Sequence, residues 1–211
     1  MKDKRLVLIG GGGHCKSVLD TVLCLDIFDE IVITDQTLLA GSTVMGCKVV
    51  GNDDILPYLY HSGIENAFIT IGSIKSTGLR CRLYELIKSI GFNLPNIIDS
   101  TAVVSESAKL GKGIFIGKNA LVNACAEIKD MAIINTGSVV EHECTIGAFA
   151  HLSVNATICG QSSVGANSFI GAGATIIQGL HIGNNTIIGA GSVVLEDVGS
   201  NKIVHGVIKS K

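Results

Sequence analysis

Aliphatic residues recur at every sixth position from Ile98 to Val194 without a break. A spacing of six does not fit the helical period of 3.6, so these side chains would spiral around a helix instead of forming one face. Six is a multiple of two, so short strands can place all of them on the same face, provided that the chain turns a corner between strands. The seventeen positions are Ile98, Val104, Leu110, Ile116, Val122, Ile128, Ile134, Val140, Ile146, Leu152, Ile158, Val164, Ile170, Ile176, Ile182, Ile188 and Val194.

Two further positions of the repeat are restricted in size. The residue four places after the aliphatic one is mostly small, which suits a narrow interior. Glycine or asparagine often follows the aliphatic residue directly, and both tolerate the positive φ that a tight bend requires. These glycines and asparagines are Gly111, Gly117, Asn123, Asn135, Gly147, Gly165, Gly171, Gly183 and Gly189.

Hexapeptide periodicity of this kind is typical of parallel β-helices, in which each unit buries its apolar face only by stacking on its neighbours. Three hexads would make one triangular coil, so the repeat predicts roughly five to six coils. We expect this all-β domain to span residues 96–198, followed by a polar tail at 199–211 that caps the open end. The pattern itself does not set the handedness of the coil.

Residues 1–95 instead alternate apolar strand-like runs with helical patterns, which predicts a small parallel α/β domain. An apolar run at 5–9 leads into four glycines and then a helical pattern, the opening of a nucleotide-binding βαβ unit. Gly10 and Gly12 fit the dinucleotide fingerprint, but position 15 is Cys, so a plain tight turn stays open as an alternative.

Asp35 and Gln36 follow the second predicted strand. An acid at this distance from the glycine loop meets a ribose hydroxyl in dinucleotide-binding folds, although an exposed loop Asp is the simpler interpretation. The α/β region is too short for a full dinucleotide fold. We therefore predict a half-Rossmann domain that holds a nucleotide-linked group, which disfavours a hydride-transfer enzyme.

Composition narrows the function classes. The chain of 211 residues is 47% hydrophobic with a formal net charge of −2, so no basic excess suggests nucleic acid or an anionic membrane as a partner. No apolar run approaches twenty residues and the N-terminus lacks signal-peptide features, so we expect a cytoplasmic protein. Seven cysteines without a C-x-x-C pair are expected to be free thiols.

Reactive side chains are rare in the hexads, with one exception around His142 and Glu143. A carboxylate beside a histidine raises its basicity by stabilising the imidazolium, so the pair can serve as a general base if it sits at a corner. A solvated polar corner is the alternative. Zinc is disfavoured, because ligands from stacked coils should recur near eighteen residues and His142, His151 and His181 do not.

The Gly-Gly-Gly-His segment at 11–14, the run Asn-Thr-Gly-Ser-Val-Val-Glu-His-Glu-Cys at 135–144 and the hexad array together resemble one family. It is that of the bacterial sugar O-/N-acetyltransferases of the sialic acid O-acetyltransferase (NeuD/PglD-like) type, whose members include N-acetyltransferases of nucleotide-linked 4-amino sugars. The resemblance implies a left-handed β-helix, a homotrimer, and acetyl-CoA as co-substrate in a cleft between neighbouring coil stacks, with no metal.

The resemblance also implies roles for residues at matching positions. His142 would be the general base and Glu143 would raise its basicity, in a direct transfer without an acyl-enzyme. Acetyl-CoA would be contacted by His151, Gly160, Ala172 and Ala190, with the Gly160 N–H facing the thioester oxygen. The nucleotide sugar would be held by Gly12, Gly13, His14, Asp35, Gln36 and Gly72.

Two departures from the family pattern affect these expectations. The chain ends Gly-Val-Ile-Lys-Ser-Lys where members commonly carry Gly-Val-Pro-Ala-Lys, which puts CoA contacts from the tail in doubt. Four glycines in a row leave the phosphate cradle undefined. A sugar O-acetyltransferase of the sialic acid type and a non-catalytic nucleotide-sugar-binding trimer are the alternatives to an N-acetyltransferase.

Overall fold

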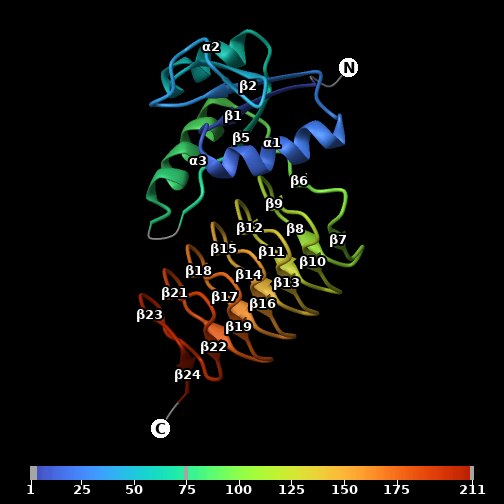
Figure 1. The fold of residues 1–211 in the computed structure, drawn as a ribbon, viewed down its shortest axis with the longest axis vertical. Helices are drawn as coiled ribbons and strands as arrows, with labels where there is room; N and C mark the ends of the chain where they lie inside the picture. Colours follow the sequence, from blue (N-terminus) through green and yellow to red (C-terminus); the bar gives the residue numbers. More distant parts are fainter. Residues whose placement is uncertain (1–3, 74–75, 210–211) are drawn as a thin grey trace. The chain divides into compact units, whose positions relative to one another are not determined.

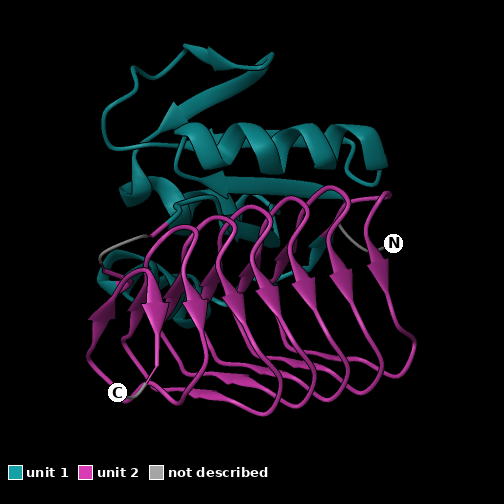
Figure 2. Cartoon of the chain, turned by 60° about the horizontal axis from the view of Figure 1, so that its bottom comes forward, with its two compact units in different colours: residues 1–72, 78–97 teal, residues 73–77, 98–211 magenta. Residues whose placement is uncertain are grey.

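A computed structural model describes residues 4–73 and 76–209 of the chain, which divides into two compact units. The first comprises residues 1–72 and 78–97, and the second comprises residues 73–77 and 98–211 (Figure 2). The division falls two residues after the expected boundary at residue 95, and a short segment of the α/β region, 73–77, belongs to the second unit.

The first unit is a five-stranded sheet with helices, as expected from the alternating pattern. The strand order is β3-β4-β2-β1-β5, and all pairs are parallel except β3 with β4. The strands are β1 (Arg5–Ile9), β2 (Glu30–Thr34), β3 (Thr43–Val44), β4 (Cys47–Gly51) and β5 (Asn66–Ile69). The helices are α1 (Gly13–Leu25), the short 3₁₀ helix η1 (Asp53–Ile55), α2 (Leu56–His61) and α3 (Gly78–Ile90) (Figure 1).

Two details of this unit differ from expectation. The helix expected from about Asp53 begins as the 3₁₀ turn η1 and becomes α2 at Leu56, with Pro57 in the first turn, where its missing N–H breaks no hydrogen bond. The β3–β4 hairpin was not predicted. Its two turn residues, Met45 and Gly46, both have positive φ, and methionine is not a residue that signals such a turn.

The second unit is a left-handed parallel β-helix, which confirms the predicted fold class. Its two-residue strands stack in parallel rows (Figures 1 and 2), and each pairs with the strand eighteen residues away, as Leu121 does with Val139. The strands that build the coils are β6 (Ile97–Ile98), β7 (Val103–Val104), β8 (Lys109–Leu110), β9 (Phe115–Ile116), β10 (Leu121–Val122), β11 (Glu127–Ile128), β12 (Ile133–Ile134), β13 (Val139–Val140), β14 (Thr145–Ile146), β15 (His151–Leu152), β16 (Thr157–Ile158), β17 (Ser163–Val164), β18 (Phe169–Ile170), β19 (Thr175–Ile176), β20 (His181–Ile182), β21 (Ile187–Ile188) and β22 (Val193–Val194).

The aliphatic residue of each hexad is the second residue of its strand and points into the coil stack. From Ile116 to Val194 these side chains are at most 2% exposed, whereas Ile98, Val104 and Leu110 at the first coil are partly buried. The small residues, such as Ala126 and Ala156, fill the remaining interior and are fully buried. The coil stack is therefore a packed core without a channel.

The corners of the coils are built differently from what we expected. Positive φ occurs three residues after the aliphatic one, as at Asn119, and not at the glycine directly after it. Those glycines are needed for a different reason. A Cβ on Gly171 would come within 2.4 Å of the backbone nitrogen of Ala190 in the next coil, so at Gly171 the two coils approach too closely for a side chain.

The polar segment after Val194 continues the stack. It contains β23 (Ile203–Val204) and β24 (Val207–Ile208), which pair with β21 and β22. Ile187 pairs with Ile203, sixteen residues on, and Val193 with Val207, fourteen residues on. The last coil is thus shorter than the others and does not follow the six-residue period. Its strands could therefore not be recognised from the repeat.

Candidate active site and nucleotide pocket

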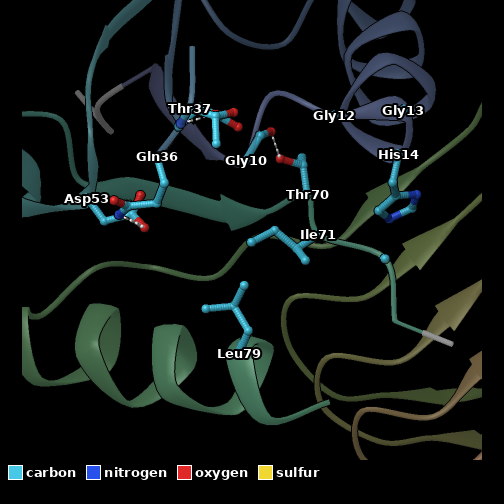
Figure 3. Close-up of a pocket in the computed structure, with 12 residues that line it drawn as sticks. Gly10, Gly12, Gly13, His14, Gln36, Thr37, Asp53, Thr70, Ile71 and Leu79 are labelled. Carbon is cyan, nitrogen blue, oxygen red and sulfur yellow. Dashed lines mark hydrogen bonds between the residues drawn. The ribbon is translucent and has the colours of Figure 1, made fainter. Parts of the chain in front are cut away.

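The first unit contains a pocket of about 420 Å³ at the C-terminal ends of strands β1, β2 and β5 (Figure 3). All six residues that the resemblance assigned to the nucleotide sugar line it, although they come from three separate stretches of sequence. The lining residues are Gly10, Gly12, Gly13, His14, Asp35, Gln36, Thr37, Asp53, Thr70, Ile71, Gly72 and Leu79.

The four glycines of the loop have two different functions. Gly10 has a φ of +103° and a Cβ on it would come within 2.7 Å of the Ile71 side chain, so the fold itself requires glycine there, whereas a Cβ on Gly11 would displace the end of the Leu38 side chain. A Cβ on Gly12 or Gly13 would meet only open space. Gly12 is the N-cap of α1 and provides no side-chain cap. The backbone N–H groups at the start of this helix are therefore accessible to an anion in the pocket.

Asp35 organises the loop after β2. Its Oδ2 accepts the Gly11 N–H at 2.7 Å, and its Oδ1 accepts from the N–H and hydroxyl of Thr37 and from the Leu38 N–H. Burial opposes ionisation, but these donors outweigh it and lower the pKa of Asp35 to about 2. The carboxylate ties the β2 loop to the glycine loop and so shapes the wall of the pocket.

Sequence reasoning missed three polar residues of the pocket: Thr37, which bonds Asp35, and also Thr70 and Asp53. Thr70, at the end of β5, donates its hydroxyl to the carbonyls of Ile9 and Gly10 and so fixes the entry of the glycine loop. Asp53, at the start of η1, accepts from Thr34 and from Gln36. A strand-end position was the signal available for Thr70, but Asp53 reaches the pocket only through the tertiary fold.

The second unit holds His142 and Glu143 at the corner that follows β13. The His142 Nδ1 lies 3.2 Å from the Glu143 Oε2. An ionised carboxylate can only accept a hydrogen bond, so Nδ1 carries a proton, and in the neutral imidazole Nε2 then keeps its lone pair. The imidazole is thus held in the tautomer in which Nε2 acts as a base. Both side chains are about half exposed, at 53% and 55%.

Glu143 is held by the next coil. It occupies the positive-φ position common to the corners, with φ of 59°, and Gln161 occupies the same position eighteen residues later. The Gln161 Nε2 donates to the Glu143 Oε2 at 3.1 Å, which is the oxygen that faces His142. This hydrogen bond, followed by the one from His142, lowers the pKa of Glu143 below its ordinary value.

Gly160 lies against the His142 ring. The next coil brings the two together, because Gly160 stands eighteen residues after His142. At the same corner of the two preceding coils, the N–H groups of Ala124 and His142 are capped by the side chain of the residue before them, as Ala124 is by Asn123 at 2.8 Å. The residue before Gly160 is Cys159, which has no side-chain oxygen. In the described part of the chain no group accepts the Gly160 N–H, which leaves a donor beside the base.

The remaining predicted CoA contacts lie elsewhere on the coil stack. His151 belongs to β15 in a different sheet from β13 and is only 8% exposed. Its Nδ1 donates to the Ser73 carbonyl at 3.0 Å, and its ring packs edge-on against Phe169. Ala172 and Ala190 stack at the corner between the sheet of β15 and the sheet of β13. A single chain therefore does not bring His151 next to His142.

Other chemistry has little support among the described residues. All seven cysteines are free thiols, and burial raises the pKa of Cys144 and Cys159, which adjoin Glu143 and Gly160 in the sequence. Residues 4–73 and 76–209 contain no group of three or more His, Cys, Asp or Glu side chains that could hold a metal ion. No helix in these ranges has the length and apolar character needed to cross a membrane.

Family models match both units of the chain. The PglD N-terminal domain matches residues 5–87, and the bacterial transferase hexapeptide (six repeats) matches residues 161–196. The first model covers the pocket up to Leu79, and the second begins one residue after Gly160.

Solved structures match nearly the whole chain. A mutant of GDP-perosamine N-acetyltransferase from Caulobacter crescentus, in complex with CoA and GDP-perosamine, is 40% identical over 95% of this chain and 93% of that one, with a TM-score of 0.87. The acetyltransferase domain of PglB from Neisseria gonorrhoeae, in complex with acetyl coenzyme A, is 32% identical over 97% of both chains, with a TM-score of 0.90. WeeI from Acinetobacter baumannii, at 19% identity and a TM-score of 0.61, shares the fold.

The sequence identity to the Caulobacter and Neisseria proteins extends over both units, and each unit also matches a family model. The chain thus resembles these proteins in sequence as well as in fold. The chain therefore belongs to the NeuD/PglD-like family of hexapeptide-repeat sugar acetyltransferases.

Proposed function

We propose that this chain transfers the acetyl group of acetyl-CoA to the 4-amino group of a nucleotide-linked sugar, with His142 as the general base. The observation that carries the proposal is the contact between the His142 ring and Gly160. A base nitrogen and an uncapped backbone N–H are the two groups that acyl transfer to an amine requires, one for the proton and one for the oxyanion.

The proposed reaction proceeds in one covalent stage without an acyl-enzyme. The amine nitrogen attacks the thioester carbonyl, and the His142 Nε2 takes the proton that the nitrogen loses. The carbonyl oxygen becomes an oxyanion and accepts the Gly160 N–H. The C–S bond then breaks, the amide forms, and the CoA sulfur leaves with the proton from His142. Glu143 stabilises the imidazolium between these two proton transfers.

Nucleotide-sugar binding is supported by the pocket of the first unit. Gly12, Gly13 and the start of α1 offer backbone N–H groups to a diphosphate, and His14 and Gly72 border the same space. The Caulobacter relative was crystallised with a nucleotide-linked sugar and CoA, which favours an acceptor of this class over a free sugar.

The acetyl-CoA site is proposed to lie between subunits of a homotrimer, with His151, Ala172 and Ala190 as its contacts. Two features support an assembly. One chain keeps His151 in a different sheet from the strand that leads to His142, and the outward residues of the sheet that includes β7, β13 and β24 are mostly apolar. Its residues include Val103 and Val207, which are 61% and 63% exposed. Exposed apolar faces of this kind commonly mark subunit interfaces.

The function is tested by CoA release with acetyl-CoA and a panel of UDP-, GDP- and dTDP-linked 4-amino sugars beside free sialic acid. We expect turnover on one nucleotide-linked amine. His142→Ala should reduce kcat by about 10²- to 10⁴-fold. The control is His181→Ala, an exposed histidine of β20 whose ring hydrogen-bonds the Ser163 hydroxyl; it should retain activity.

Other outcomes would replace the proposal. Turnover on the free sugar alone would indicate an O-acetyltransferase, and full activity of His142→Ala would remove the base assignment. Failure to bind acetyl-CoA in calorimetry would favour a non-catalytic nucleotide-sugar-binding protein. An acetylated protein detected by intact mass after incubation with acetyl-CoA alone would contradict direct transfer.

A further inference from the structure

The pocket of the first unit has two chemically different ends. Figure 3 shows Gly12, Gly13 and His14 at one end and Gln36 with Asp53 at the other. The proposed function assigns the diphosphate to the glycine end, at the start of α1. The nucleobase is then left for the end that contains Asp53, a residue that none of the earlier assignments uses.

Asp53 is held rigidly with its charge uncompensated. The Thr34 hydroxyl donates to its Oδ1 at 2.8 Å and the Gln36 Nε2 donates to its Oδ2 at 2.9 Å. Thr34 is fully buried, so the carboxylate is anchored to the interior of the unit through this hydroxyl. In the described ranges no lysine or arginine forms an ion pair with Asp53. Each oxygen accepts one neutral donor and retains the capacity for another.

This end of the pocket can accept hydrogen bonds but has little to donate. A carboxylate offers only acceptors. Gln36 must turn its amide nitrogen toward Asp53, because the carboxylate cannot donate to its oxygen. A ligand that binds here therefore needs two adjacent N–H donors, matched to the two oxygens, to make the paired charge-assisted hydrogen bonds that a carboxylate favours.

Among the common nucleobases only guanine has such an edge, with N1–H beside the N2 amino group. Uracil and thymine present one N–H between two carbonyl oxygens, which the carboxylate would repel. Adenine and cytosine present an amino group beside a ring nitrogen lone pair. We propose that this pocket selects a guanine nucleotide, and that Asp53, positioned by Thr34 and Gln36, determines this specificity by accepting from guanine N1–H and N2–H₂.

Calorimetry with the full-length protein and GDP, UDP or dTDP tests the proposal without depending on acetyl transfer. We expect GDP to bind about 10- to 100-fold more tightly than UDP or dTDP, the discrimination typical of one good bidentate contact to a base. Asp53→Asn should remove most of this preference and leave UDP affinity within a few-fold of the wild type, because the diphosphate contacts remain.

Two more variants separate specificity from folding. Asp54→Asn changes the neighbouring exposed carboxylate, which bonds Asn52 and does not line the pocket, and it should keep the full GDP preference. Thr34→Val removes the anchoring hydroxyl but no proposed ligand contact, and it should reduce GDP affinity more than UDP affinity. Circular dichroism establishes that each variant is folded.

The outcomes distinguish this proposal from the function on which it rests. Equal or tighter binding of UDP or dTDP by the wild type, or an undiminished GDP preference in Asp53→Asn, would overturn the guanine assignment. If a UDP- or dTDP-linked amine is then acetylated, the proposed function still stands. Binding of no nucleotide at all would overturn both.

Discussion

The His142 ring lies so close to Gly160 that a Cβ on Gly160 would come within 2.5 Å of Nε2 and 2.6 Å of Cε1. The two residues stand eighteen positions apart, one coil of the stack, and meet at the same corner of successive coils. Glycine at this position therefore has a specific consequence. It lets the His142 ring lie against a residue whose backbone N–H is accepted by no group of the described chain.

Gly160→Ala should abolish most activity without unfolding the protein. The added Cβ would push the exposed imidazole aside, and misplacing a catalytic group by about 1 Å can cost roughly a hundredfold in rate. We expect kcat to fall by about that factor while the thermal unfolding midpoint stays close to that of the wild type. Gly199→Ala, where a Cβ meets nothing within 4 Å, is the matched control and should leave kcat unchanged.

Gln161→Leu should raise the pKa of Glu143. Gln161 donates to the ionised carboxylate and so favours it, and its loss removes the largest cause of the lowered pKa. On acidification, Glu143 in this variant is then protonated at a higher pH than in the wild type. We also expect a lower kcat, because Glu143 without Gln161 orients the His142 ring less firmly. Carboxyl NMR titration measures the pKa directly. Gln178→Leu, one coil further on, should leave it unchanged, and an unshifted Glu143 in Gln161→Leu would refute the coupling.

Asp35→Asn should lower stability at neutral pH but not at strongly acidic pH. The folded-state pKa of Asp35 is about 2, below the ordinary value of 3.8, so its ionised form stabilises the fold. That contribution is fully present above pH 3.8 and is lost as pH falls through about 2. Thermal unfolding of the wild type and Asp35→Asn should be measured from neutral pH to pH 2. The difference between their midpoints should become smaller toward pH 2. A gap that stays constant would show that the charge is not its cause.

Gly171→Ala should destabilise the coil stack. The Cβ would meet the backbone nitrogen of Ala190 at 2.4 Å, and backbone cannot move aside as a side chain does. Overpacking of this kind costs about 1–3 kcal/mol. Urea unfolding should therefore show a lower midpoint for Gly171→Ala than for Gly199→Ala, which adds the same methyl group in open space. Equal midpoints would mean that adjacent coils can separate at little cost.

Much of the second unit could be predicted because its repeat is local. The hexad aliphatics, such as Ile146 and Ile176, were expected to point inward and are fully buried. The bends were placed wrongly by two positions. Glycine is favoured both by positive φ and by close backbone approach, and composition alone does not separate these causes. The last coil escaped prediction because its spacing is shorter than the repeat.

The first unit illustrates a different limit. The glycine loop, Asp35 and Gln36 follow strands, and strand ends that meet at one edge of a parallel sheet can be recognised from sequence. Asp53 and Thr34 could not be linked in this way. They are nineteen residues apart in no repeating pattern, and only the packing of η1 beside β2 brings the carboxylate to the buried hydroxyl.

By itself the sequence determined the β-helix, the α/β unit before it and the candidate base. A six-residue period fits short strands separated by bends, and the candidate base and its carboxylate are neighbours in the sequence. The tertiary structure alone decided which corner residues meet across coils. Stacking at eighteen residues sets Gly160 against His142 and Gln161 against Glu143, because each coil hydrogen-bonds to the next in a fixed parallel register.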